Sequence, residues 1–305
     1  MKAVFITCLL LALGGLASAT AQTPTTATVG AYVPHRVYDT QRGAFTDFET
    51  MEADLARADV VLIGEQHDDE NSHRLELAML EGLARRRVPV TLSLEMFERD
   101  VQSSVDTYLS GSSGEDDFLK SARPWPRYAT DYRPLLEFAR LQHWPVVAAN
   151  VPRRIASDVA KSGRPAVDSL TTEDRSLAAA DLQCPHDAYY DRFAEQMGGH
   201  QSGSAQSGTD STTERYYLAQ CIKDETMAES IAAAFAKQAG RPGVVVHVTG
   251  SFHSDYGEGT GERVRRRLAG RRVATVSMVP VENIDARAPK PAELKKADYL
   301  VLTVK

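Results

Sequence analysis

The sequence contains little cysteine and no excess of positive charge. Only 3 of its 305 residues are cysteines, and 41 acidic residues outnumber 35 lysines and arginines. A chain without a basic excess lacks the electrostatic footprint of a nucleic-acid-binding protein, so we exclude that class of partner. Cys8 lies in the apolar N-terminal segment, and the two remaining thiols, Cys184 and Cys221, are weak evidence for a metal site. In an oxidising compartment they could pair, and the sequence leaves this open.

The sequence also lacks apolar runs long enough to cross a bilayer. Residues 3–16, AVFITCLLLALGGL, follow Lys2 and precede small-residue triplets at 17–19 and 19–21. These are the parts of an export signal, and the run is short for a membrane span. We therefore predict a signal peptide over residues 1–21, a loose leader over 22–35, and an exported protein that is periplasmic or associated with the cell envelope.

Six apolar runs predict the strands of a sheet. Most of them are continuous rather than alternating, which is typical of strands buried on both faces of a mostly parallel sheet. Helical patterns at 71–86, 131–142 and 152–161 lie between them. This order predicts an α/β fold with helices flanking a mostly parallel sheet. The predicted strands are 59–65, 90–96, 145–151, 243–250, 273–279 and 299–304.

Residues 163–240 interrupt this alternation. They contain several helical patterns but no strand pattern, and Thr171 with Asp174 suits a capping box at a helix start. Residues 198–213, GGHQSGSAQSGTDSTT, are too polar and small to build a core, so we expect a mobile loop there. We predict a smaller helical lobe at about 163–240, inserted into a domain that spans 36–300.

Polar side chains follow four of the predicted strands where each strand ends. They are Glu65 and His67 after the first, Glu95 at the second, Asn150 at the third and His253 after the fourth. In open parallel sheets, ligands bind at the carboxyl ends of the strands. Two imidazoles with one or two carboxylates suit a divalent transition metal, and they also suit a general base with its orienting acid.

Each of these residues also has a purely structural interpretation. Glu65 could bond to the start of the next helix, and His67 could be a surface loop residue. His73 begins a helix, where histidines are usually solvated. His247 lies inside a strand pattern, which is typical of a core histidine that has a hydrogen-bond partner.

A second group of residues could line the ligand site. Glu225 is the single charge on a helical stripe at positions 218, 221, 225, 228, 232 and 235. It either reaches solvent at the edge of this stripe or faces the cleft between the helical lobe and the sheet. Tyr132, Arg153 and Tyr256 could help to hold a flat anionic ligand, because aromatic rings stack and arginines pair with carboxylates. Ordinary packing and surface charge are the alternatives for each.

Five stretches of the sequence, in this order, resemble the ChaN-like haem-binding proteins of the Tiki superfamily. The resemblance extends over roughly residues 36–280. The stretches are VLIGEQHDDENSH (61–73), LSLEMFERD (92–100), YRPLLEFARLQHWPVVAANVPRR (132–154), CIKDETMAESI (221–231) and HVTGSFHSDYGEG (247–259).

The resemblance implies an exported α/β protein of haem or iron uptake. It implies haem as cofactor, outer-membrane uptake proteins as partners and a haem-sharing homodimer. The wider superfamily includes the Tiki metalloproteases and the erythromycin esterases, and their sites match Glu65, His67, Glu95 and His253 here. The chain departs from the haem-binding branch in two ways, because it lacks a lipobox before Cys8 and carries the serine- and glycine-rich loop.

Two functions therefore remain open at this point. The first is haem or iron binding in the cleft at the strand ends, with a ligating tyrosine among Tyr132, Tyr189, Tyr190 and Tyr256. The second is a metal-dependent hydrolase, a protease or an esterase, in which His67, Glu95 and His253 hold a divalent transition metal or activate water. Glu65 or Glu225 would then move a proton.

Overall fold

The computed structural model describes residues 33–199, 212–238, 243–285 and 288–305. The predicted signal peptide and nearly all of the predicted leader lie outside these ranges. Most of the predicted loop at 198–213 also lies outside these ranges, between the end of α10 at Gly199 and the start of α11 at Thr212. No helix in the described ranges is long and apolar enough to cross a membrane.

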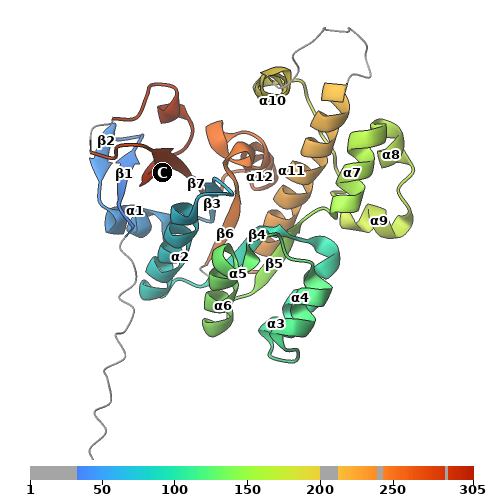
Figure 1. The fold of residues 1–305 in the computed structure, drawn as a ribbon, viewed down its shortest axis with the longest axis horizontal. Coiled ribbons are helices and arrows are strands. Elements are labelled where there is room, and N and C mark those ends of the chain that lie inside the picture. Colours follow the sequence, from blue (N-terminus) through green and yellow to red (C-terminus); the bar gives the residue numbers. More distant parts are fainter. Residues whose placement is uncertain (1–32, 200–211, 239–242, 286–287) are drawn as a thin grey trace, which may run out of the picture. The chain divides into compact units, whose positions relative to one another are not determined.

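An eight-stranded sheet forms the centre of the described chain (Figure 1). Its strand order is β2-β1-β8-β7-β3-β6-β4-β5. The strands from β8 to β5 are parallel, whereas β1 pairs antiparallel with β2 and with β8. The predicted α/β class with a mostly parallel sheet is confirmed. The strands are β1 (His35–Asp39), β2 (Ala44–Thr46), β3 (Val60–Glu65), β4 (Val90–Glu98), β5 (Val146–Asn150), β6 (Val244–Gly250), β7 (Val273–Val281) and β8 (Tyr299–Val304).

The six predicted strands match β3 to β8, and the two that the patterns missed are β1 and β2. In β3, β6 and β8, nearly every residue is buried, which is why these segments read as continuous apolar runs. The antiparallel strands β1 and β2, at one edge of the sheet, are partly exposed. Strand β2 has three residues, and none of them is buried. Such short and polar strands carry little periodic signal.

Helices cover both faces of the sheet (Figure 1). The patterns at 71–86 and 152–161 correspond to α2 and α7, and the pattern at 131–142 corresponds to α6, with only its first residue in α5. Helix α2 is capped by Asp69, whose carboxylate accepts from the N–H of Asn71, so the helix begins one residue before the predicted pattern. The helices are α1 (Phe48–Leu55), α2 (Glu70–Arg85), α3 (Gln102–Leu109), α4 (Glu115–Ala122), α5 (Tyr128–Asp131), α6 (Arg133–Leu141), α7 (Arg153–Ser162), α8 (Arg164–Asp168), α9 (Thr172–Leu177), α10 (Ala188–Gly199), α11 (Thr212–Lys237) and α12 (Thr260–Arg267).

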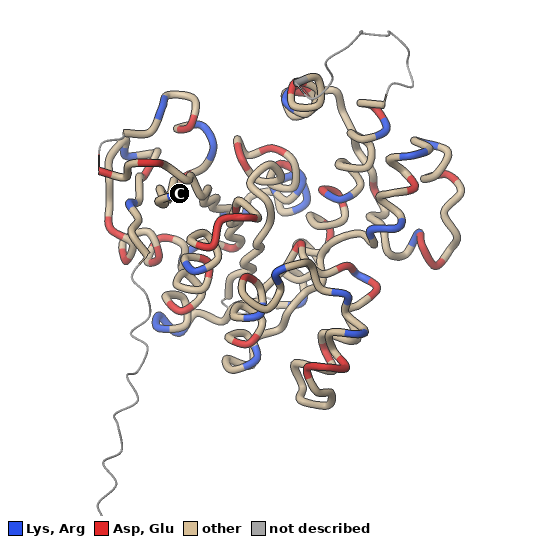
Figure 2. The backbone as a smooth tube through the Cα atoms, viewed as in Figure 1, with Lys and Arg blue, Asp and Glu red and all other residues tan. Residues whose placement is uncertain are grey.

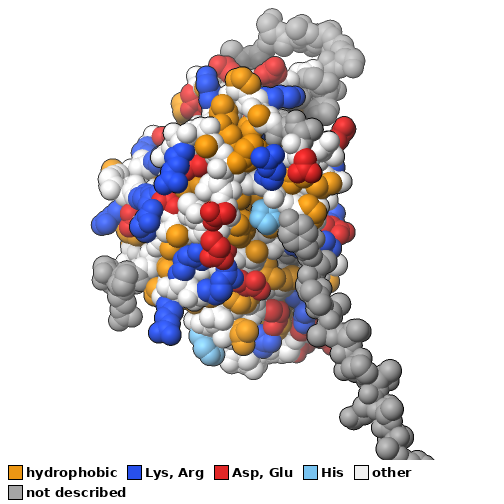
Figure 3. Space-filling view, turned by 90° about the vertical axis from the view of Figure 1, so that its left-hand side faces the viewer, with side chains coloured by type: hydrophobic (Ala, Val, Ile, Leu, Met, Phe, Trp, Pro, Cys, Tyr) orange, Lys and Arg blue, Asp and Glu red, His pale blue; other side chains and the backbone are white. Residues whose placement is uncertain are grey.

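The described residues between β5 and β6 contain helices and no strand, from α7 to α11. Thr171 caps α9 by accepting from the N–H of Asp174, as the capping pattern predicts. These helices belong to the same compact unit as the sheet. Figures 2 and 3 show acidic and basic residues interspersed along the chain and on one face of the molecule.

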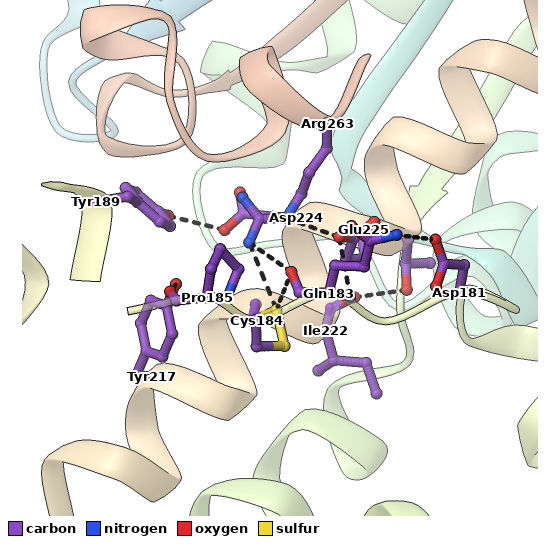
Figure 4. The surroundings of a disulfide bond; sticks show 12 residues. Asp181, Gln183, Cys184, Pro185, Tyr189, Tyr217, Ile222, Asp224, Glu225 and Arg263 are labelled. Carbon is purple, nitrogen blue, oxygen red and sulfur yellow. Dashed lines mark hydrogen bonds and ion pairs between the residues drawn. A yellow bond between two sulfur atoms is a disulfide. The ribbon is translucent and has the colours of Figure 1, made fainter. Parts of the chain in front are cut away.

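A disulfide joins Cys184 to Cys221 (Figure 4). The sequence left this pairing open, and the structure forms it with a Cα–Cα distance of 5.8 Å. The bond holds the segment before α10 against the first half of α11. Tyr217 reinforces the contact, because its hydroxyl donates to the backbone oxygen of Pro185 (2.7 Å).

Candidate functional site

The carboxyl ends of β3, β6 and β4 lie side by side in the sheet. Glu65 ends β3 and is in register with Gly250, which ends β6. The close approach needs glycine at both ends: an added Cβ at Gly250 would lie 2.8 Å from His67 Nε2, and one at Gly64 would lie 2.4 Å from Ser254 Oγ. Each strand thus has a glycine at or next to its end that is followed three residues later by a histidine, at 64–67 and 250–253, and the two segments meet over one sheet edge.

His67 is held from one side by a buried carboxylate. Its Nδ1 lies 2.5 Å from Oε1 of Glu65, and the hydroxyl of Tyr132 donates to the same oxygen at 2.9 Å. The hydrogen bond to Glu65 is the main cause of a raised pKa at His67. The side chain of His67 is 48% exposed, whereas that of Glu65 is buried. Trp125 packs with its ring edge toward the imidazole, at 5.2 Å between centroids.

Glu95 and His253 meet beside this pair. Glu95 Oε2 accepts from the hydroxyl of Thr249 (2.5 Å) and from the N–H of Gly250 (2.9 Å). Its Oε1 lies 3.4 Å from Nε2 of His253. Burial opposes a charge on His253, but the carboxylates of Glu95 and Asp224 outweigh it and raise the pKa of His253 to about 10. His253 is therefore a buried imidazolium at neutral pH.

Asp224 is the residue of the site that the sequence patterns missed. Its Oδ1 accepts from Nδ1 of His253 at 2.7 Å and from the hydroxyl of Thr260 at 2.8 Å, and its Oδ2 accepts from Tyr189 (Figure 4). Burial is the largest influence and raises the pKa of Asp224, but the charge and hydrogen bond of His253, the charge of Arg263 and the hydrogen bond of Tyr189 together outweigh it and lower this pKa. The signal that could have found Asp224 is a second stripe of α11, at positions 217, 221, 224, 228 and 231, all of which are buried.

A second cluster lies behind Glu65. His73 is 4% exposed, so the prediction that it is solvated is wrong. Its Nδ1 lies 3.0 Å from Oε2 of Glu65 and 3.3 Å from Oε2 of Glu76, and its Nε2 lies 3.5 Å from Oδ2 of Asp131. Burial opposes a charge on His73, but the bonds to Glu65 and Glu76 raise its pKa to about 11. Burial raises the pKa of Glu76 well above its ordinary value.

Asn150 holds the backbone of β4 at Glu95 and does not contact the side chains of the site. Its side-chain nitrogen donates to the backbone oxygen of Glu95 at 3.2 Å. Tyr132 is also brought to the site, through Glu65. Within the described residues, possible ligand atoms of Glu65, His73 and Glu76 lie within 4.8 Å of one another, whereas those of the predicted trio His67, Glu95 and His253 do not.

Three of the predicted ligand-site residues have their contacts elsewhere. Glu225 is buried against Arg263, Arg266 and Arg267 at 3.2, 2.7 and 2.5 Å, so it is neither a solvent-facing stripe edge nor a cleft acid (Figure 4). Arg153 is exposed and lies 4.0 Å from Glu98. The ring of Tyr256 stacks under the guanidinium of Arg192, 4.1 Å from the ring centroid. Glu225 does not contact His253 because Asp224, one position earlier on α11, is the acid that bonds to it.

A cavity of about 760 Å³ lies at the opposite ends of the strands. It is lined by the residues that precede or begin β4, β5 and β6, together with side chains of α11 such as Glu229 and Lys237. It is therefore separate from the carboxyl-end residues described above.

Residues 51–264 match the model of the family described as "Haem-binding uptake, Tiki superfamily, ChaN". The chain belongs to this family. Its fold is similar to that of ChaN of Campylobacter jejuni, whose structure is described as showing cofacial haem binding. The two share 15% identity with a TM-score of 0.64, over 89% of this chain and 97% of that one.

More distant similarity extends to an esterase. The erythromycin esterase EreC in an open conformation shares 12% identity, with a TM-score of 0.45 over 89% of this chain and 83% of that one. The type III effector HopBA1 shares 14% identity, with a TM-score of 0.45 over 84% and 92%. A search of curated protein sequences gave no match.

Proposed function

We propose that this chain binds haem at the carboxyl ends of β3 and β6, with His67 as an iron ligand. The observation that carries the proposal is the state of His67: half of its side chain is exposed, and its Nδ1 is held by a buried carboxylate. A carboxylate bonded to one ring nitrogen of a histidine fixes the tautomer and directs the other nitrogen at a metal. Nε2 of His67 would be that nitrogen, and haem would supply an iron atom that accepts its lone pair.

Three of the four tyrosines considered as haem ligands are less suited to the task. A tyrosine ligates iron as phenolate, so a raised pKa opposes ligation. Burial and the charge of Glu65 raise the pKa of Tyr132, and burial and Asp224 raise that of Tyr189. Tyr190 donates to Glu214, and this bond raises its pKa to about 12. Tyr256 is the remaining tyrosine, under the guanidinium of Arg192.

The finer biological role is part of the same proposal. We place the protein in the cell envelope, after export, in haem or iron uptake, with outer-membrane uptake proteins as partners. Support comes from the family's description as haem-binding uptake proteins and from the signal-like first 21 residues. The cofacial haem of ChaN motivates a haem-sharing homodimer. Light scattering with and without haem tests it, and a mass that stays monomeric at saturation would exclude the dimer.

The experiment that tests haem binding is a titration of the mature protein, followed by visible absorption. We expect a saturable Soret band, and for His67→Ala an affinity at least about tenfold lower. His186→Ala is the matched control, because His186 is also a half-exposed histidine but pairs with Glu214, away from the strand ends. Haem bound equally by all three proteins, or no saturable band, would overturn the proposal.

One observation favours a second function, that of a hydrolase. The pair of Asp224 and His253, with Glu95 at 3.4 Å, is an imidazole held between two acids, as in general acid–base sites. The imidazolium could protonate a leaving group. The test is hydrolysis of peptide and ester substrates, with and without a chelator, by the parent and by His253→Gln. Chelator-sensitive turnover that His253→Gln abolishes would establish this function. If no such turnover is found, haem binding would remain as the single proposed function.

A further inference from the structure

We infer that Glu65, His73 and Glu76 form a buried site for a divalent transition cation, separate from the haem site. Glu65 comes from the end of β3, and the other two lie on α2 at positions i and i+3, which face the same side of a helix. One ligand atom from each residue lies within 4.8 Å of the others. The side chains of Glu65 and Glu76 are fully buried, and that of His73 is 3% exposed.

Two buried carboxylate oxygens in this cluster have no hydrogen-bond partner. They are Oε2 of Glu65 and Oε1 of Glu76, at side chains with no exposure. Buried carboxylate oxygens are almost always bonded, because an unpaired one costs free energy. One imidazole lies between the two acids, and its Nδ1 forms an ion pair with Oε2 of Glu65 at 3.0 Å, so Oε1 of Glu76 is the oxygen left without a partner. One possible ligand atom from each of the three groups lies within 4.8 Å of the other two, so a cation bound between them would contact all three.

The far side of the imidazole has the environment of a metal-ligating histidine. Nε2 of His73 lies 3.3 Å from the backbone oxygen of His67 and 3.5 Å from Oδ2 of Asp131. Both groups are acceptors, so Nε2 would keep its hydrogen when a cation binds, and Nδ1 would exchange the proton that it shares with the two glutamates for the cation. A carboxylate behind the imidazole is the usual second partner of a histidine bound to a metal.

The donors select the class of cation. One imidazole nitrogen and two carboxylates, with no thiolate, suit Zn²⁺, Mn²⁺ or Fe²⁺. Glu65 also connects the two sites, because its other oxygen holds His67 and Tyr132. A cation at Oε2 would fix the carboxylate that orients the proposed haem ligand. The cation site itself does not depend on whether haem binds.

The test is the zinc content of the full chain after treatment with a chelator, incubation with excess ZnCl₂ and gel filtration. We expect one Zn²⁺ per chain for the parent and loss of zinc for Glu76→Gln and for His73→Gln. Glu52→Gln is the control, because Glu52 is equally buried but is paired with Arg85 and Arg86. No retained zinc in the parent, or unchanged zinc in Glu76→Gln, would overturn the inference.

A second variant keeps the inference falsifiable if these substitutions prevent folding. Asp131→Asn leaves all three ligands in place and removes the charge behind His73, although Asp131 also pairs with Arg127 and accepts from Thr130. The variant should still bind zinc, with an affinity about tenfold or more lower. Zinc should raise the thermal midpoint of the parent more than that of Asp131→Asn. Equal shifts would contradict the site. His67→Ala should keep its zinc, so that loss of haem and loss of zinc are distinguishable.

Discussion

Asp224 Oδ1 lies 2.7 Å from Nδ1 of His253, whereas its neighbour Glu225 is buried among three arginines. The two acids are adjacent in the chain and are both fully buried. One holds a histidine at the strand ends, and the other ties α11 to α12. This difference allows the site to be tested with a control that has the same charge and burial.

Asp224→Asn should lower the pKa of His253, and Glu225→Gln should not. In the parent, burial opposes the charge on His253 while Glu95 and Asp224 favour it, with a pKa of about 10 as the result. Removing one charge should lower this pKa by at least about 1. A titration of the imidazole ¹⁵N resonances measures it. Equal values of the pKa in the two variants would show that Asp224 does not govern His253.

The pH dependence of stability should contain a contribution from His247. Burial lowers the pKa of this strand residue to about 4, and its Nδ1 bonds to the hydroxyl of Ser93 at 2.9 Å. Below pH 6.5 the unfolded chain binds a proton that the folded chain rejects until about pH 4. Stability is therefore lost as the pH falls through this window, by about 3 kcal/mol for this group.

The variant His247→Gln isolates that contribution, because glutamine does not titrate and can still bond to Ser93. Urea unfolding of both proteins between pH 7 and about pH 4 should show the parent losing stability faster than the variant. Curves that stay parallel over the whole range would mean that His247 does not resist protonation in the folded state.

The disulfide between Cys184 and Cys221 should contribute substantially to stability. The two cysteines are 37 positions apart, and closing a loop of that length in the unfolded chain corresponds to about 4 kcal/mol. Reduction, or the double change of both cysteines to serine, should lower the urea midpoint by a matching amount. An unchanged midpoint after reduction, verified by thiol counting, would refute this role.

The sheet could be predicted from sequence because its strands are buried on both faces. Runs such as Val60 to Ile63 are continuous and apolar, and each ends at a polar group or a glycine. The parallel order then placed Glu65, Glu95 and His253 at one edge. By contrast, β1 and β2 form a short, partly exposed antiparallel edge, where neither length nor periodicity gives a signal.

The acids of α11 and α2 could not be assigned in the same way. Helix α11 is buried on several sides, so its apolar stripe can be drawn through Glu225 or through Asp224 with equal regularity. Only the tertiary contact with His253 separates the two. Likewise, His73 and Glu76 lie in the polar first turns of α2, and they become buried because Glu65 and Asp131 approach them from other elements.

The measurement that tests the central claim most directly is the visible spectrum of ferric haem bound to the parent and to His67→Tyr. If His67 ligates the iron through Nε2, the parent should show an imidazole-ligated spectrum. The variant should instead show the charge-transfer band of a phenolate ligand, while His186→Tyr leaves the spectrum unchanged. Identical spectra for the parent and His67→Tyr would contradict haem binding through His67.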